Sequence, residues 1–127
     1  MQTCIELPED AQAIVNELEP QFDDMVFTGS QIIGGAKPDS DWDFVVSCSE
    51  AELNLKRLPT PDTTCGRISC EHTRKITTYR FGKVNLIVDH RGPQILDNWR
   101  IATDYCIEHG LVDKQERIKA FEMLGAG

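Results

Sequence analysis

The stretch TGSQIIGGAKPDSDWDFVV, residues 28–46, decides how this chain is interpreted. It begins with Gly29-Ser30 after a short apolar segment and ends in an apolar run that directly follows Asp41 and Asp43. Side chains alternate along a strand, so the two aspartates project from one face of a strand at "DWDFVVS". The segment therefore predicts two carboxylates side by side, preceded by a glycine-serine turn.

Both parts of this segment have a clear chemical use. Two carboxylates on one strand face can coordinate the same divalent cation, and oxygen ligands suit Mg²⁺, with Mn²⁺ as an alternative. A Gly-Ser pair at a strand end allows close backbone approach and offers a hydroxyl and an N–H to phosphate oxygens. Either part alone is more often an ordinary polar turn. Their combination indicates metal-assisted chemistry on a nucleoside triphosphate.

The flanking sequence predicts one α/β (α+β) domain over residues 1–127, with helices mainly on one side of a small mixed sheet of three to five strands. Such a fold would place the two aspartates at an exposed end of the sheet. Helices are expected at residues 8–18, from Ser30, after Ser49 and twice within residues 93–124. Strands are expected at residues 25–27 and 41–47, and as a pair within residues 74–89 that is joined near Gly82. Residues 58–66 are expected to be a loop.

The two helices expected within residues 93–124 carry apolar stripes. The first has Trp99 in its stripe, and the second begins at Asp113 and would turn Ile118, Phe121 and Leu124 inward. We expect both helices to complete the core of the domain, because no other role is indicated by their residues.

Composition limits the classes of partner. The 127 residues carry a net charge of −8, which opposes binding of extended nucleic acid because such binding requires basic side chains. No apolar run reaches the length of a membrane span, and the first residues lack the pattern of a secretory signal. We therefore expect a cytoplasmic protein that does not act in a membrane.

The five cysteines favour reduced thiols, because their number is odd and they are widely spread. Cys65, Cys70 and His72 form the only group that suggests zinc. The spacing of the two cysteines is unusual and no fourth ligand is evident, so ordinary thiols are the favoured interpretation.

The segment resembles the signature of the nucleotidyltransferase superfamily related to DNA polymerase beta, especially its minimal bacterial and phage-type members. That signature has Gly-Ser, a further glycine about four residues on, and then a Pro-x-Ser-Asp-x-Asp turn. The matching residues here are Gly29, Ser30, Gly34, Pro38, Ser40, Asp41 and Asp43. The resemblance is strong over residues 25–46 and compatible in element order to about residue 90.

The resemblance implies a reaction and a division of roles. Gly29, Ser30 and Ser40 would bind the nucleotide, and Asp41 and Asp43 would be catalytic residues that hold Mg²⁺. The implied enzyme moves a nucleoside monophosphate from a nucleoside triphosphate, such as ATP, to an acceptor hydroxyl and releases pyrophosphate. The base of the nucleotide stays open, and so does the acceptor, which is a protein, a small molecule or an RNA end.

One position departs from the family pattern. The third carboxylate of the family lies on a later strand, and the matching catalytic position here is Asn85 in "KVNLIVD". Asparagine offers a neutral carbonyl oxygen but no charge and no basic atom. Asp89 shares a strand face with Asn85 but lies ~13 Å further along. A second hypothesis follows, in which the chain is a catalytically impaired, antitoxin-like protein that binds a nucleotide or a partner.

Overall fold

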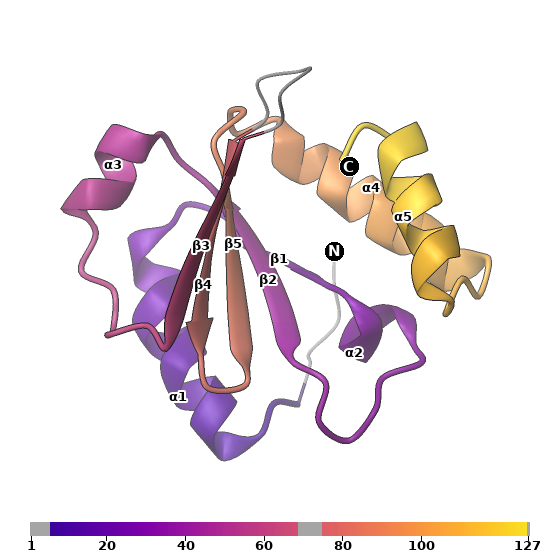
Figure 1. Ribbon diagram of the computed structural model, residues 1–127, viewed down its shortest axis with the longest axis horizontal. Coiled ribbons are helices and arrows are strands. Elements are labelled where there is room, and N and C mark those ends of the chain that lie inside the picture. Colours follow the sequence, from indigo (N-terminus) through magenta and orange to yellow (C-terminus); the bar gives the residue numbers. More distant parts are fainter. Residues whose placement is uncertain (1–5, 69–74, 127) are drawn as a thin grey trace.

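A mixed five-stranded sheet forms the centre of the computed structural model, which describes residues 6–68 and 75–126 (Figure 1). The predicted α/β class is confirmed. The strand order is β1-β2-β5-β4-β3, in which β2 and β5 are parallel and all other neighbours are antiparallel. The strands are β1 Val26–Thr28, β2 Trp42–Ser47, β3 Thr63–Ile68, β4 Lys75–Phe81 and β5 Val84–Asp89.

The helices begin and end close to the predicted positions. They are α1 Glu9–Leu18, α2 Ser30–Ile33, α3 Glu50–Leu55, α4 Ile95–Glu108 and α5 Lys114–Met123, with a 3₁₀ turn at Glu19–Gln21 after α1. Ser49 and Asp113 act as N-caps, because their side chains accept hydrogen bonds from N–H groups in the first turns of α3 and α5. Local capping chemistry thus explains why these two helices begin where they do.

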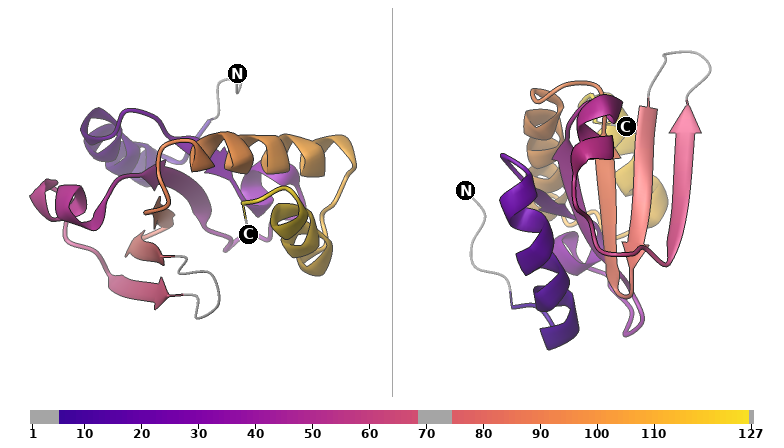
Figure 2. Two further views of the ribbon diagram at one scale, coloured as in Figure 1. Left: turned by 90° about the horizontal axis from the view of Figure 1, so that it is seen from above. Right: turned by 90° about the vertical axis from the view of Figure 1, so that its left-hand side faces the viewer.

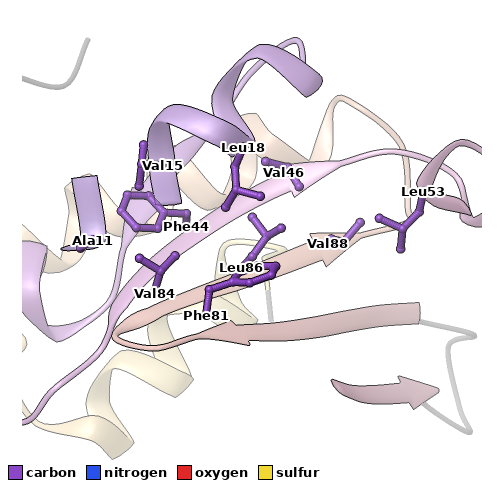
Figure 3. Packing of buried hydrophobic residues seen from close by; sticks show 10 residues of the cluster. All are labelled: Ala11, Val15, Leu18, Phe44, Val46, Leu53, Phe81, Val84, Leu86 and Val88. Atoms are coloured by element: carbon purple, nitrogen blue, oxygen red, sulfur yellow. The ribbon is translucent and has the colours of Figure 1, made fainter. Parts of the chain in front are cut away.

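One face of the sheet packs against α1 and α3 (Figure 3). Three residues of α1 and one of α3 lie over alternating residues of β2 and β5 and over the end of β4. This cluster consists of Ala11, Val15, Leu18, Phe44, Val46, Leu53, Phe81, Val84, Leu86 and Val88. Its apolar side chains account for the period-two pattern of the two central strands.

The opposite face is covered by α4 and α5, so the prediction of helices mainly on one side is wrong (Figures 1 and 2). Val45 of β2 and Val26 of β1 pack there against Leu96 and Trp99 of α4. The physical reason is visible in the sequence. In "FVV", residues 44–46 are all buried, and a continuous apolar run is typical of a strand with both faces covered.

A second correction concerns residues 58–66, which were predicted to be a loop. Strand β3 begins within this segment, at Thr63, and pairs antiparallel with β4 at the edge of the sheet. Pro59 and Pro61 dominate the local signal, whereas the pairing that stabilises β3 depends on a strand further along the chain. Cys70 and His72 of the suggested zinc group lie outside the described residues, as does the side chain of Cys65.

A two-residue turn, Gly82-Lys83, joins β4 to β5, close to where the sequence predicted a connection. Gly82 has a φ of +62°, which a glycine adopts without strain. The carbonyl of Lys83 accepts a hydrogen bond from the N–H of Trp42 at 2.7 Å, so the turn is attached to the start of β2. Among the helices in the described part of the chain, none has both the length and the apolar character needed to cross a membrane.

Candidate functional site

The start of β2 brings Asp43 and Asn85 together. The parallel register of β2 and β5 places Asp43 beside Asn85, and the antiparallel register of β1 places Thr28 on the other side of Asp43. Asn85 Nδ2 donates a hydrogen bond to Asp43 Oδ1 at 3.1 Å. The position that the sequence matched to the third carboxylate therefore does face Asp43 from the neighbouring strand.

Gly29 lies directly against the carboxylate of Asp43. Its φ is +85°, and a Cβ placed on Gly29 would be 2.1 Å from Asp43 Oδ2, too close for any side chain. The carbonyl of Gly29 accepts hydrogen bonds from Ile32 and Ile33, which fixes the first turn of α2 to this glycine. The absence of a side chain at Gly29 is what allows backbone and carboxylate to meet.

Partial burial makes the carboxyl group of Asp43 unusually basic. Desolvation is the largest effect and raises the pKa of Asp43 from 3.8 to about 6. The hydrogen bond from Asn85 lowers this pKa, the negative charge of Asp41 raises it, and the positive charge of Arg117 lowers it. The ionised form of Asp43 is thus poorly stabilised by the groups that surround it.

Asp41 has a different environment from Asp43, although only one residue separates them. It precedes β2, and its Oδ1 accepts a hydrogen bond from Arg80 Nη2 at 3.0 Å. The Arg80 side chain is 47% exposed and that of Asp41 is 24% exposed. Asp41 therefore forms a surface ion pair, while Asp43 lies further inside.

The two serines of the predicted nucleotide site occupy different places. Ser30 is the first residue of α2, directly after Gly29. Ser40 belongs to a turn, in which its Oγ accepts from the N–H of Lys37 at 2.8 Å and its own N–H donates to the Lys37 carbonyl at 3.0 Å. Gln31 Nε2 also donates to the Ser40 carbonyl, at 3.0 Å. The hydrogen bonds of Ser40 thus stabilise the conformation of the loop between α2 and β2.

A pocket of about 410 Å³ opens beside Asp43 and runs under α5. Its walls come from the end of β1, α2, the two central strands, α4 and α5. The lining residues are Thr28, Gly29, Ile33, Asp43, Ile87, Trp99, Lys114, Arg117, Ile118, Phe121 and Glu122. The volume lies in the range of small-molecule sites. Sequence reasoning missed the contribution of α5, since Lys114 and Arg117 look like ordinary surface cations of a helix.

Contacts with the signature segment fix the position of α5. Val112, just before this helix, packs on Gly34 and Gly35, where an added Cβ would in each case be 3.1 Å from an atom of Val112. Trp99 and Phe121 make an edge-to-face contact with ring centroids 5.5 Å apart. Of the three residues predicted to turn inward, Phe121 and Leu124 pack against the core, whereas Ile118 is 41% exposed and lines the pocket.

The donor set at this site suits Mg²⁺ and does not suit zinc. Asp41, Asp43 and the amide of Asn85 offer only oxygen ligands to a metal, and Mg²⁺ takes the rest of its shell from water and phosphate. Within residues 6–68 and 75–126, no group of three or more His, Cys, Asp or Glu side chains is arranged to hold a metal. Any metal here would therefore depend on its substrate for ligands.

Asp89 does not replace Asn85, because it is fully buried in another network. Its Oδ2 accepts hydrogen bonds from Arg91 Nη2 at 2.7 Å and from Trp99 Nε1 at 3.0 Å. Burial alone would raise the pKa of Asp89, but the hydrogen bonds and charge of Arg91 and the Trp99 N–H bring it below its ordinary value. This carboxylate stabilises the fold at the end of β5.

Comparison of the chain with models of protein families, with curated proteins and with solved structures finds no match in any of the three. The resemblance of residues 25–46 to the nucleotidyltransferase signature therefore stays a prediction from the sequence.

Proposed function

We propose that this chain is a Mg²⁺-dependent nucleotidyltransferase that moves a nucleoside monophosphate from a nucleoside triphosphate to an acceptor hydroxyl. Gly29, Ser30 and Ser40 belong to the turn and loop that surround the nucleotide, and Asp41 and Asp43 hold the metal. The proposal combines the sequence resemblance with the geometry at the start of β2.

The observation that carries the proposal is the contact of Gly29 with the Asp43 carboxylate. Gly29 and Asp43 both line the pocket, so a phosphate group bound there would lie near the backbone of the glycine-serine turn and near an oxygen ligand for its metal. The pocket next to this contact has the size of a small-molecule site. The part of the pocket beside Gly29 and Asp43 would thus hold both a phosphate group and its metal ion.

The residues of the chain have limited but definite tasks in this reaction. The acceptor oxygen bonds to the α-phosphorus, the bond from that phosphorus to the bridging oxygen breaks, and pyrophosphate leaves with the electron pair. Asp41 and Asp43 would hold Mg²⁺, which would supply neutralisation of the charge on the phosphate oxygens. Asp43 must be ionised to bind a cation, and Asn85 orients it through their hydrogen bond. Asn85 has no basic atom, so the acceptor proton leaves to water.

The free thiols and the net charge of the chain indicate the compartment and the acceptor classes that suit this reaction. Cys48 and Cys106 are free thiols, which fits a reducing compartment such as the cytoplasm. The net charge of −8 disfavours extended nucleic acid as the acceptor. A protein, a small molecule and a short RNA end stay as acceptor classes.

The test is pyrophosphate release from each nucleoside triphosphate in the presence of Mg²⁺ or Mn²⁺ and fractionated acceptors. Release is expected from the wild-type chain and is expected to disappear in Asp43→Ala. Asp97→Ala is the matched control, because Asp97 is an exposed aspartate on α4. A wild-type chain that binds no nucleotide with either metal would contradict the proposal.

A second candidate function rests on the identity of Asn85. Its Nδ2, not a carboxylate oxygen, meets Asp43, so the site has one negative charge less than the family pattern. In this alternative the chain binds a nucleotide or a protein partner but does not turn the nucleotide over. Asn85→Asp separates the two functions. Nucleotide binding without pyrophosphate release in wild type, with release gained in Asn85→Asp, would favour the binding protein.

A further inference from the structure

Helix α5 presents one continuous stripe of side chains to the pocket beside Asp43. Lys114, Arg117, Ile118, Phe121 and Glu122 follow the i, i+3, i+4, i+7, i+8 spacing of one helix face. The two cations stand at the start of the helix and the two apolar residues in its middle. Glu122 is eight residues from Lys114, ~12 Å along the axis. The stripe is therefore cationic at one end and apolar further along.

Lys114 and Arg117 bring two positive charges to the start of α5. In the part of the chain that the structure describes, neither Lys114 nor Arg117 forms an ion pair. Arg117 Nη1 donates a hydrogen bond to the carbonyl of Val112 at 2.7 Å, which holds the guanidinium in place.

Contacts before and after α5 fix the position of this helix. At the start of α5, Val112 packs on Gly34 and Gly35. At the end of α5, Asn98 Nδ2 donates to the Gly125 carbonyl at 3.3 Å and Arg91 Nη2 to the Ala126 carbonyl at 3.0 Å. Figure 1 shows the beginning of α5 on the same side of the sheet as α2. The packing of α5 therefore fixes the place of Lys114 and Arg117 at the pocket.

Resting on the proposed function, we propose that Lys114 and Arg117 bind the phosphate groups of the nucleoside triphosphate while Ile118 and Phe121 contact its nucleoside. The pocket is lined by the Asp43 carboxylate, by Gly29 and by the two cations, which form no ion pair with the residues that the structure describes. A ligand with a polyphosphate and a flat, less polar group matches this order. The nucleotide then lies along α5, and its triphosphate is held between Asp43 and the start of the helix.

Calorimetric titration tests this assignment with two probes, inorganic triphosphate and a non-hydrolysable ATP analogue, each with Mg²⁺. Lys114→Gln and Arg117→Gln are each expected to weaken both probes about tenfold, as for the loss of a charge-assisted hydrogen bond. Ile118→Gln is expected to weaken the ATP analogue several-fold and to leave inorganic triphosphate unchanged. Lys119→Gln, on α5 but outside the pocket lining, is the control and should bind both probes like wild type.

Two further variants keep the inference separate from the fold and from the proposed function. Arg117→Lys retains the charge and is expected to keep most of the affinity, and urea midpoints show whether each variant is folded. Unchanged binding in Lys114→Gln and Arg117→Gln, together with loss of Mg²⁺-dependent binding in Asp43→Ala, would overturn the inference and leave the proposed function standing. Weakened binding in the two variants, together with unchanged Mg²⁺-dependent binding in Asp43→Ala, would support the cationic phosphate site and would contradict Asp43 as the metal ligand of the proposed function. A wild-type chain that binds neither probe would overturn both.

Discussion

Asp43 and Asp89 lie on the same face of neighbouring strands, yet their carboxyl groups behave in opposite ways. Asp89 is fully buried and has a pKa below its ordinary value, whereas Asp43 keeps some exposure and has a pKa raised to about 6. Burial raises the pKa of both groups, and only Asp89 has enough hydrogen-bond donors and positive charge beside it to reverse that effect.

The two surroundings correspond to two roles. Asp89 accepts hydrogen bonds from the Arg91 side chain, the Arg91 N–H and the Trp99 indole, so its charge is balanced inside the protein. Asp43 accepts one side-chain hydrogen bond, from Asn85, and faces a pocket. A carboxylate that the protein leaves short of donors beside a pocket is suited to a cation from outside. Asp89 is thus a structural anchor, and Asp43 is the metal ligand under the proposed function.

Replacing Asp89 should give the largest effect. Asp89→Asn leaves the Arg91 guanidinium without its buried partner, and breaking such a pair costs about 3–5 kcal/mol. The free energy of unfolding, measured by urea denaturation, is expected to fall by that amount. Asp97→Asn is the control, because Asp97 is 74% exposed and its change should be within about 0.5 kcal/mol. An equal loss of free energy of unfolding in Asp89→Asn and Asp97→Asn would contradict the role of Asp89 as a structural anchor.

Gly29→Ala should destabilise the protein by about 2–3 kcal/mol, because the new Cβ is strained at a φ of +85° and meets the Asp43 carboxylate. Gly82→Ala is the matched control. Its φ is +62°, no atom lies within 4 Å of the added Cβ, and it should lose only about 1 kcal/mol. Urea denaturation of both variants, and of Gly29→Ala combined with Asp43→Ala, isolates the close contact. Additive effects in the double variant would show that Gly29 and Asp43 do not interact.

Asp43→Asn should stabilise the metal-free protein at pH 7 by on the order of 1–2 kcal/mol, because it removes an ionised group that burial disfavours. The sign follows from the raised pKa. Between pH 3.8 and about 6 the folded state holds more protons on Asp43 than the unfolded state does, so rising pH favours unfolding across this window. Urea midpoints from pH 4 to 8 should show wild type losing stability relative to Asp43→Asn up to about pH 6. A constant difference would mean that the pKa of Asp43 is not raised.

The smallest effect is expected for the ion pair of Asp41. Arg80→Gln should change the free energy of unfolding by about 0–0.5 kcal/mol, because the pair is exposed to solvent and screened by salt. Thermal unfolding at low and high ionic strength measures this change. A loss above about 1 kcal/mol would place Asp41 in the same category as Asp89.

Much of the fold could be predicted from local patterns. The stripe of α1, the caps at Ser49 and Asp113 and the alternation in β2 and β5 are properties of neighbouring residues, and the structure has these elements within a residue or two of the expected positions. Strand β3 could not be predicted in the same way, because it depends on pairing with a separate strand, β4, which no local pattern shows. The second helical layer was missed although "FVV" carried the signal, since three consecutive buried residues require two covered faces.

Only part of the candidate site could be predicted from the sequence. Asp43 and Gly29 could be identified from the strand pattern and the glycine-serine turn, and Asn85 from the resemblance to the nucleotidyltransferase signature. Lys114 and Arg117 could not, because their approach to the pocket depends on how α5 packs against α4 and the glycine loop, which no local pattern encodes.

The two-residue turn at Gly82-Lys83 has a consequence for insertions and deletions. It fixes which residues of β5 face β4 and β2, and side chains alternate strictly along a strand. One extra residue in this turn would shift β5 by one position and send Asn85 and Asp89 into the apolar layer under α1. We therefore expect length changes at residues 82–83 to be destructive.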